Sequence, residues 1–267
     1  MNRRSFLNSL AVLGTAFVIR PSAHGEAEND LKHASKANPF VNSLGMRFVP
    51  VAGAGVLFSV WHTRVQDFEA FASATGRGRR RPSFFQLQGP THPVVNMSKE
   101  DALAFCAWLT AKERKEGRLT KGQNYRLPTD WEWSVAVGLN EAPGGGPAEK
   151  DGVIKGVYPW GKQYPPPMGV GNFNQALRVD DYEFTSPVGT FPANALGLHD
   201  MGGNALQWCE DEWYGEGKKY ALLRGSSWGY SQPDWLLSSY RFGTDISPTN
   251  RHETFGFRCV LEGAEAQ

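Results

Sequence analysis

The fold of this chain is decided by two stretches near its C-terminus, Leu222–Trp228 (Leu-Leu-Arg-Gly-Ser-Ser-Trp) and Phe255–Val260 (Phe-Gly-Phe-Arg-Cys-Val). The residues between them are polar and aromatic, with no helical or alternating period. Such a segment must be held by the rest of the fold, and loops held on a scaffold are where binding and catalysis usually occur. A hairpin with a long connection that closes the domain is the simpler interpretation, and both interpretations stay open from these residues alone.

Length and composition indicate one loop-rich domain. The chain has 267 residues, of which 40% are hydrophobic, and this is enough to bury a substantial core. The 30 glycines and 17 prolines favour short elements joined by loops over a helical bundle. A net charge of +1 gives no reason to expect nucleic acid as a partner. The basic run Arg77–Arg81 lies among glycine and proline and is predicted to be a solvated loop rather than an anion site.

The N-terminus has the pattern of an export signal. The segment Asn2–Leu7 contains two arginines, a serine and Phe-Leu, as twin-arginine signals do, and an apolar run from Leu10 to Ile19 follows. That run of about ten residues is too short to span a bilayer as a helix. We predict a twin-arginine-type signal peptide at residues 1–27, a polar linker at 28–37 and a domain at 38–262. The mature protein is then periplasmic or exported, with no membrane anchor after signal cleavage.

The first half of the domain predicts strands followed by helices. Residues 42–51 alternate apolar with polar or small side chains, as a strand does, and residues 56–61 are expected to pair with them. Capping boxes and glycines predict three helices, with starts at Thr63–Gln66, Ser98–Asp101 and Thr129–Glu132 and ends at Gly76, Gly117 and Gly138.

The second half changes character beyond Gly138. Glycine and proline are frequent there, and no window keeps a helical period for long, so we expect mostly loop with short strands. The acidic run at residues 210–212 has three consecutive carboxylates that face different directions, which predicts a solvated loop and not a catalytic pair. Early helices and late irregular β structure predict an α+β domain whose function resides in the later loops.

A series of motifs occurs in order along the chain: Tyr125–Trp133, Tyr158–Gly161, Pro187–Gly189, Gly197–Trp208, Arg224–Trp228 and Gly256–Cys259. This series resembles the formylglycine-generating enzyme family, also called sulfatase-modifying factor domains, over residues 38–261. The resemblance implies a C-type-lectin-like α+β fold, loop-rich, with few helices and short strands.

The family's catalytic cysteines are missing from this sequence. In the oxidase, two cysteines after the Gly-Ser-aromatic motif bind copper(I) as thiolates and convert a sulfatase's cysteine to formylglycine with oxygen. An ungapped alignment from Ser227 places Tyr230 and Trp235 at the two cysteine positions, and the three cysteines of the chain, Cys106, Cys209 and Cys259, lie outside the loop. We therefore expect neither copper binding nor copper-dependent oxidation, and we assign no catalytic residue.

The remaining cysteines have structural interpretations. Cys106 and Cys259 match positions that form a disulfide in family members, and export would favour a persistent bond. Such a bond would join the long helix to the last strand, and two reduced buried thiols are the alternative. Cys209 matches no family ligand and is predicted to be a buried core thiol.

The resemblance also implies Ca²⁺, because two sets of oxygen donors match the family's calcium sites. Asn172, Phe173, Asp180 and Tyr182 match the first set, with Asp181 as an alternative to Asp180, and Asp200, Gly203, Ala205 and Gln207 match the second. Gln207 replaces a family glutamate, so the second site should bind more weakly, although Asp200 in place of an amide partly restores the charge. A plain polar turn is the alternative for the first set.

Two functions follow from the altered loop. In the first, the former substrate cleft binds a peptide, protein or small molecule through Ser227, Trp228, Tyr230, Trp235, Tyr240 and Arg241. Variable proteins of diversity-generating retroelements, which share the lectin-like fold, bind ligands with this segment. Some of these aromatic residues are also explained as core, Trp228 above all.

The alternative is an enzyme with altered chemistry that modifies an exported peptide or protein, as in sulfatase or siderophore maturation. Exported relatives without the cysteine pair are associated with maturation of peptide siderophores. The six histidines show no metal-ligand spacing, and Ser227 has no evident His or acid partner. We predict an exported, sulfatase-modifying-factor-like binding protein without copper-dependent oxidase activity.

Overall fold

The computed structural model describes residues 31–142, 144–215, 217–243 and 245–263. The predicted signal peptide lies outside these residues. A five-stranded antiparallel sheet has the order β1-β2-β3-β8-β4. Its strands are β1 (Phe40–Val41), β2 (Arg47–Val51), β3 (Val56–Ser59), β4 (Asn124–Arg126) and β8 (Val260–Glu262). The predicted hairpin is confirmed, with β2 and β3 paired from Phe48–Ser59 to Val51–Val56.

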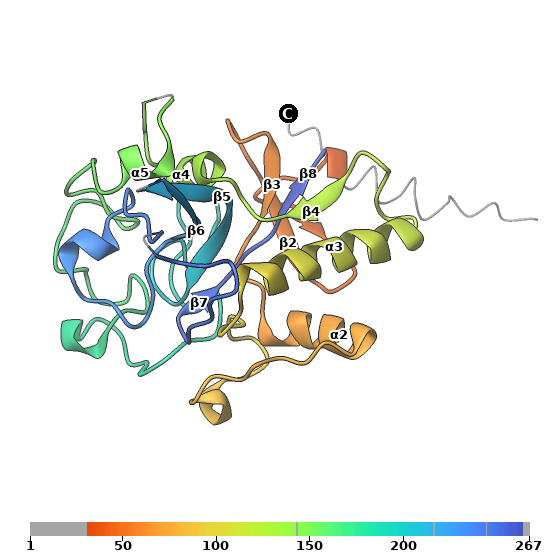
Figure 1. Cartoon of the computed structure of the whole chain (residues 1–267), viewed down its shortest axis with the longest axis horizontal. Coiled ribbons are helices and arrows are strands. Elements are labelled where there is room, and N and C mark those ends of the chain that lie inside the picture. The colour runs from red at the N-terminus through yellow and green to blue at the C-terminus, as the bar shows by residue number, and fades with distance from the viewer. Residues whose placement is uncertain (1–30, 143, 216, 244, 264–267) are drawn as a thin grey trace, which may run out of the picture.

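A second sheet has three strands in the order β6-β5-β7. The strands β5 (Leu206–Gly215) and β6 (Lys218–Arg224) are antiparallel, and β7 (Phe255–Gly256) runs parallel to β5 on its other side. The two stretches that frame the C-terminal segment therefore do not form a simple hairpin. Instead, β7 and β8 follow each other closely and belong to different sheets, so Phe255–Val260 joins the two halves of the molecule (Figure 1).

The two longer helices lie on the side of the first sheet, and the two shorter ones contact β5 of the second sheet. The elements are α2 (Val65–Thr75), α3 (Lys99–Lys115), α4 (Asp130–Val137) and α5 (Pro147–Lys150), with 3-10 turns at Phe85–Leu87, Gln175–Leu177 and Pro233–Leu236. In Figure 1, α3 passes along β4 with α2 below it, and long loops fill the opposite side. No described helix is long and apolar enough to cross a membrane.

The capping boxes of α3 and α4 are confirmed, because Ser98 and Thr129 accept hydrogen bonds from the backbone of Asp101 and Glu132. The box of α2 was predicted one residue too early. Arg64 is the N-cap there, and the Asp67 carboxylate accepts from its backbone N–H and pairs with its guanidinium. Charged partners make the stronger hydrogen bonds, so Asp67 replaces the exposed Gln66 in this role.

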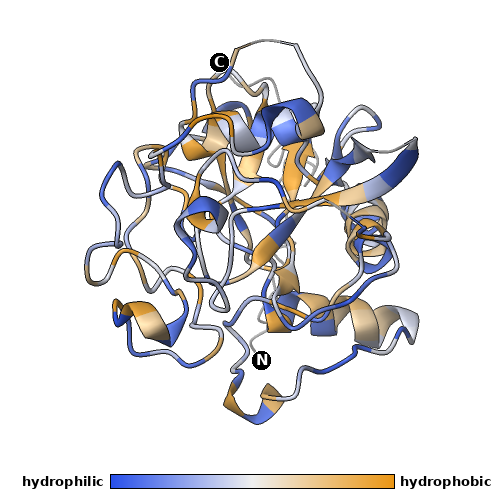
Figure 2. Cartoon of the chain, turned by 60° about the vertical axis from the view of Figure 1, so that its left-hand side comes forward, coloured by the Kyte–Doolittle hydropathy of each residue, from blue (hydrophilic) through white to orange (hydrophobic). Residues whose placement is uncertain are grey.

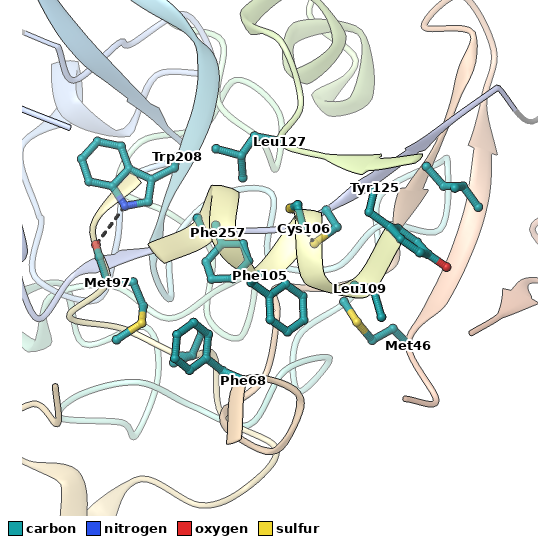
Figure 3. Close-up of a cluster of buried hydrophobic side chains, with 14 of the residues drawn as sticks. Met46, Phe68, Met97, Phe105, Cys106, Leu109, Tyr125, Leu127, Trp208 and Phe257 are labelled. Atoms are coloured by element: carbon teal, nitrogen blue, oxygen red, sulfur yellow. Dashed lines mark hydrogen bonds between the residues drawn. The ribbon is translucent and has the colours of Figure 1, made fainter. Parts of the chain in front are cut away.

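The main core lies between α2, α3 and the strands (Figure 3). The Phe105 ring lies 6.0 Å from that of Phe68 and 5.5 Å from that of Phe257, measured between centroids. The indole N–H of Trp208 donates to the Met97 carbonyl at 2.9 Å, so this fully buried side chain of β5 has its polar group satisfied. In Figure 2, the apolar colour is strongest on the strands in the interior.

Leu31 is also buried in this core, at 3% exposure, so the packed structure extends into the segment predicted as a linker.

The acidic run at residues 210–212 was wrongly predicted to be a loop, because it lies within β5, and β5 and β6 are longer than the short strands expected. The ammonium group of Lys99 donates to the carbonyls of Glu210 and Asp211 at 2.7 and 3.1 Å. A register shift between Trp208 and Glu212 interrupts the pairing with β6 at this point. A cation and a bulge therefore accommodate the charged run inside a strand.

One buried ion cluster joins α4 to the C-terminal segment. Asp130, at the first position of α4, accepts hydrogen bonds from the guanidinium of Arg224 and, at 2.9 to 3.0 Å, from that of Arg241. Arg241 also pairs with Glu141 at 2.8 Å, and the Arg224 guanidinium lies 4.3 Å from the centre of the Trp133 ring. Burial opposes ionisation of Asp130, yet the two guanidiniums hold its pKa below the ordinary value.

We expect Asp130→Asn to destabilise the protein by about 3–5 kcal/mol, because it leaves buried guanidiniums without their shared counter-charge. The free energy of unfolding from urea titration measures the loss. Since the folded-state pKa of Asp130 is lowered, its contribution is present above the ordinary carboxyl pKa and is lost as pH falls through the folded value.

Asp234→Asn is the matched control for Asp130→Asn, since the Asp234 side chain is 73% exposed in its pair with Lys155. It should change the free energy of unfolding by no more than about 0.5 kcal/mol. Equal losses in the two variants would contradict a structural role for the Asp130 cluster.

Candidate functional site

Both ends of the C-terminal loop, residues 225–240, are held at the Asp130 carboxylate. Arg224 immediately precedes the loop and Arg241 immediately follows it, and both side chains are buried against Asp130. Gly225 opens the loop at φ +93°, and a Cβ there would lie 2.7 Å from the Gln207 side chain and 3.0 Å from the Met201 carbonyl. A side chain at this position would collide with Gln207 and Met201, so packing explains the glycine of the Gly-Ser motif.

The first residues of the loop lie in the interior. Ser227 is fully buried, and its hydroxyl accepts from the Gly229 backbone N–H at 3.3 Å. The ring of Trp228 packs edge-to-face on Phe84 and Phe184, with centroids 5.5 and 5.2 Å away. The core interpretation is therefore the better one for Trp228, and Ser227 is not accessible to a ligand.

Tyr230 and Trp235, which occupy the expected cysteine positions, lie side by side. Their ring centroids are 5.1 Å apart and their planes meet at 86°. Tyr230 is partly buried, and burial raises the pKa of its phenol, whereas Trp235 is 39% exposed. The Tyr240 ring lies nearly parallel to that of Trp235, with centroids 6.4 Å apart.

A further aromatic residue joins this group from another part of the chain. Tyr164 is 40% exposed, and its hydroxyl donates to the Ser231 carbonyl within the loop at 2.8 Å. We call Tyr164, Tyr230, Trp235 and Tyr240 the aromatic surface. Sequence reasoning missed Tyr164, and its position before a run of three prolines gave no signal of a contact with the loop.

Arg241 was predicted to bind ligand, and the structure corrects this. Its side chain is 2% exposed, and its guanidinium is taken up by Asp130 and Glu141. A guanidinium with two carboxylate partners in the interior is not available at the surface. Tyr240 remains at the surface while the next residue turns inward.

The first predicted calcium set is brought together by the fold. The Asp180 carboxylate accepts from the backbone N–H groups of Phe173 and Tyr182, both at 2.9 Å, which favours Asp180 over Asp181. Asn172 donates its side-chain amide to the Phe184 carbonyl, and its buried side-chain oxygen has no hydrogen-bond partner among the described residues. Burial raises the pKa of Asp180. A buried oxygen without a donor is what a bound cation would satisfy.

Two members of the second predicted calcium set, Ala205 and Gln207, already accept hydrogen bonds from other groups. The side-chain oxygen of Gln207 accepts from the Trp133 indole at 3.1 Å and from the Arg258 guanidinium at 2.6 Å. The Ala205 carbonyl accepts from His62 at 2.8 Å. Gly203 belongs to the same turn, in close contact with the backbone of Asn172. Arg258 is itself a cation, so it occupies the electrostatic role expected of the metal.

Asp200 keeps one unpartnered atom. One of its carboxylate oxygens accepts from the Gly189 backbone N–H at 3.0 Å, and the other is buried without a partner among the described residues. Burial raises the pKa of this carboxyl. Asp200 and Met201 lie in the wall of a hollow of about 440 Å³, whose lining comes from residues 137–202 and not from the aromatic surface.

The cysteines are buried thiols in this structure. The sulfur atoms of Cys106, on α3, and Cys259, just before β8, are 3.6 Å apart, whereas a disulfide bond is about 2.05 Å long. The fold thus places the two thiols next to each other, and the disulfide between them stays a prediction. Burial raises the pKa of Cys209, which suits an inert core thiol. No group of three or more His, Cys, Asp or Glu side chains in the described ranges is arranged to hold a metal.

Comparison with known proteins identifies the relatives of this arrangement. Residues 24–263 match the model of the sulfatase-modifying factor enzyme 1-like domain. The chain is 31% identical over 176 residues to the inactive C-alpha-formylglycine-generating enzyme 2 of Bos taurus, covering 63% of this chain and 50% of that protein. It is 25% identical over 220 residues to the formylglycine-generating enzyme of Bos taurus, covering 80% and 45%. The chain thus spans about half the length of these curated relatives.

Solved structures give the same fold. PvdO from Pseudomonas aeruginosa superposes with a TM-score of 0.57 at 28% identity, covering 78% of this chain and 80% of that one. Treponema denticola variable protein 1 superposes with a TM-score of 0.56 at 19% identity, covering 77% and 84%, and supports the fold alone. The predicted α+β fold, with few helices and much loop, is confirmed.

Proposed function

Because the chain belongs to the family of sulfatase-modifying factor enzyme 1-like domains, we propose that it is an exported member that binds a peptide, protein or small molecule through the aromatic surface. In this proposal it does not carry out copper-dependent cysteine oxidation. The observation that carries the proposal is the contact between Tyr230 and Trp235, at 5.1 Å between ring centroids, in the place where the family's thiol pair is expected.

The chemistry of the donors supports the loss of oxidation. Copper(I) prefers thiolate or thioether ligands, and a phenol and an indole supply neither. The cysteines of this chain are all buried away from the loop, on α3, in β5 and before β8. A relative that resembles this chain over 176 residues is itself named an inactive formylglycine-generating enzyme.

The shape of the aromatic surface supports binding. Trp235 and Tyr164 are each exposed by about two fifths, at 39% and 40%, while Tyr230 and Tyr240 are partly buried and contact the Trp235 ring. Rigid aromatic side chains give a large contact area at small conformational cost, and they dominate many binding sites. Because Asp130 holds both ends of the loop, the surface is organised before a ligand arrives.

An enzyme with altered chemistry is the second candidate. The resemblance to exported relatives that lack the cysteine pair and are associated with the maturation of peptide siderophores favours it. Such an enzyme would modify an exported peptide or protein. It would change the mass of its substrate, whereas a binding protein leaves its ligand unchanged.

We expect the protein to leave a sulfatase-type cysteine peptide unchanged when copper and oxygen are supplied. Peptide mass and oxygen consumption are measured with and without copper, with an active formylglycine-generating enzyme as the positive control. Copper-dependent loss of the peptide thiol and formation of formylglycine would contradict the proposal, because the loop has no thiolate to hold the metal.

Selection from a displayed random-peptide library tests whether the aromatic surface binds peptides. Peptides enriched on the protein should lose at least tenfold in affinity for Trp235→Ala, since truncating a central aromatic contact removes about 2 kcal/mol or more. Trp131→Ala is the matched control, because Trp131 is 43% exposed on α4. Enriched peptides that bind Trp235→Ala as tightly as the unaltered protein, or a library that yields no binder, would count against a peptide-binding surface.

We also propose calcium at the first donor set, held by Asn172 and Asp180 with the carbonyls of Phe173 and Tyr182. The unpartnered oxygen of Asn172 and the convergence of these segments on Asp180 support it. A bound Ca²⁺ would order a loop-rich region and would take no part in the chemistry of the aromatic surface.

Calcium should raise the melting temperature, because a ligand at about 100 times its Kd stabilises by about 2.7 kcal/mol. Differential scanning calorimetry with calcium and with chelator measures the shift. Asp180→Asn should abolish it, and Asp181→Asn, one residue further on, should retain it. An unchanged melting temperature on calcium addition, or equal effects of the two variants, would exclude this site.

Export by the twin-arginine route and a disulfide between Cys106 and Cys259 belong to the same proposal. The arginine pair and apolar run at the N-terminus support the first, and the proximity of the two sulfur atoms, at 3.6 Å, supports the second. An oxidising compartment would allow such a bond to persist.

A further inference from the structure

A projecting loop between α2 and α3 carries exposed apolar and basic side chains. It contains the basic run Arg77–Arg81 and the 3-10 turn Phe85–Leu87. Figures 1 and 2, which differ by a rotation about the vertical axis, both place this turn at the lower edge of the molecule. The loop therefore projects from the edge of the fold.

The loop is firmly anchored to the domain. Pro82 and Phe84 are buried, and the Phe84 ring stacks on Phe184 with centroids 4.4 Å apart. The Gln88 side chain accepts from the Arg79 guanidinium at 3.1 Å and donates to the Pro93 carbonyl at 2.9 Å. The tip is thus presented on a fixed base.

The tip itself is apolar. Phe85 is 38% exposed and Leu87 is 65% exposed, and both belong to the same 3-10 turn. Buried Phe84 and exposed Phe85 are neighbours, so one aromatic ring anchors the turn while the next faces solvent. Exposed apolar side chains within one projecting turn are candidates for contact with a partner or a membrane.

The arginines divide into paired and unpaired residues. Arg77 pairs with Asp101 and Arg79 pairs with Glu69, both at 3.0 Å. Arg80 and Arg81 are exposed, and no ion pair to either occurs among the residues that the structure describes. The Arg81 guanidinium lies 5.2 Å from the centre of the Phe85 ring, so an unpaired cation sits directly beside the apolar tip.

We propose that this loop binds the surface of a membrane rich in anionic phospholipid. Arg80 and Arg81 contact the phosphates of the headgroups, while Phe85 and Leu87 enter the boundary between headgroups and acyl chains. Basic residues near an anionic leaflet and apolar side chains at that depth are the two components of peripheral membrane binding. A projecting tip on an anchored base can reach the boundary between headgroups and acyl chains.

This surface lies next to the C-terminal loop through one contact. Phe84 packs against Trp228 as well as against Phe184, so the base of the membrane-binding tip touches the start of the loop that carries the aromatic surface. The inference does not depend on what the aromatic surface binds.

Flotation of the full chain with vesicles tests the proposal. Vesicles of phosphatidylcholine with phosphatidylglycerol should bind the protein, and vesicles of phosphatidylcholine alone should bind it much less. Arg80→Glu/Arg81→Glu should reduce partitioning by at least about 25-fold, or roughly fivefold for each arginine lost. Raising the salt concentration should weaken binding in the same direction, because screening shortens the range of the attraction.

The control uses an exposed leucine elsewhere on the molecule. Leu87→Asp should reduce binding, whereas Leu103→Asp on α3, where Leu103 is 41% exposed, should not.

A fluorescent label at the tip gives an independent measurement of insertion. The native cysteines are buried, so an environment-sensitive dye reacts selectively with Leu87→Cys, and the dye's emission should shift to the blue on anionic vesicles. All variants keep the N-terminal segment, so its contribution is constant. Binding that survives both the arginine and Leu87 variants, or a dye that stays in water, would overturn the proposal, as would failure to bind anionic vesicles.

Discussion

The carboxylate of Asp130 is shared by two buried guanidiniums, and the candidate site depends on this shared charge. Arg224 ends β6 and Arg241 follows the loop, so one carboxylate fixes the two points from which the loop departs. Asp130 is itself fixed as the first residue of α4, whose capping box orients the helix. Removing a partner from such a cluster leaves a buried charge, and this makes the geometry of the loop ends costly to change. An exposed residue between those ends, such as Trp235, can then vary without loss of the fold, whereas Gly225 and the buried Leu236 cannot.

Much of the framework was predictable because its signals are local. Capping boxes at Ser98 and Thr129 act over three residues, and the hairpin of β2 and β3 follows from alternation within a short window. The order of motifs led to the family, which the comparisons bear out. The correspondence of Tyr230 and Trp235 with the family's cysteine positions came from the resemblance alone and stays a prediction, and the structure places their two rings in contact.

The errors arose where distant residues decide the outcome. Arg241 lies 111 residues from Asp130 in sequence, so nothing near Arg241 indicates that its charge is already paired. The acidic run of β5 is stabilised by Lys99, which is just as far away. Gln207 was read as a weakened calcium ligand, yet its oxygen serves Trp133 and Arg258. In each case a buried charge or hydrogen bond between remote elements overrides the local pattern.

The central claim is that the loop between Arg224 and Arg241 keeps the family's geometry while its thiol pair is replaced by an aromatic pair. The most direct measurement is a copper(I) titration of Tyr230→Cys/Trp235→Cys in competition with a chromophoric chelator, beside the unaltered protein and Tyr230→Cys/Trp131→Cys. If the positions correspond, the first variant binds one copper(I) per chain and the other two proteins leave the metal with the chelator, because two neighbouring thiolates are needed. If Tyr230→Cys/Trp235→Cys takes copper(I) from the chelator no better than Tyr230→Cys/Trp131→Cys does, the claim is contradicted.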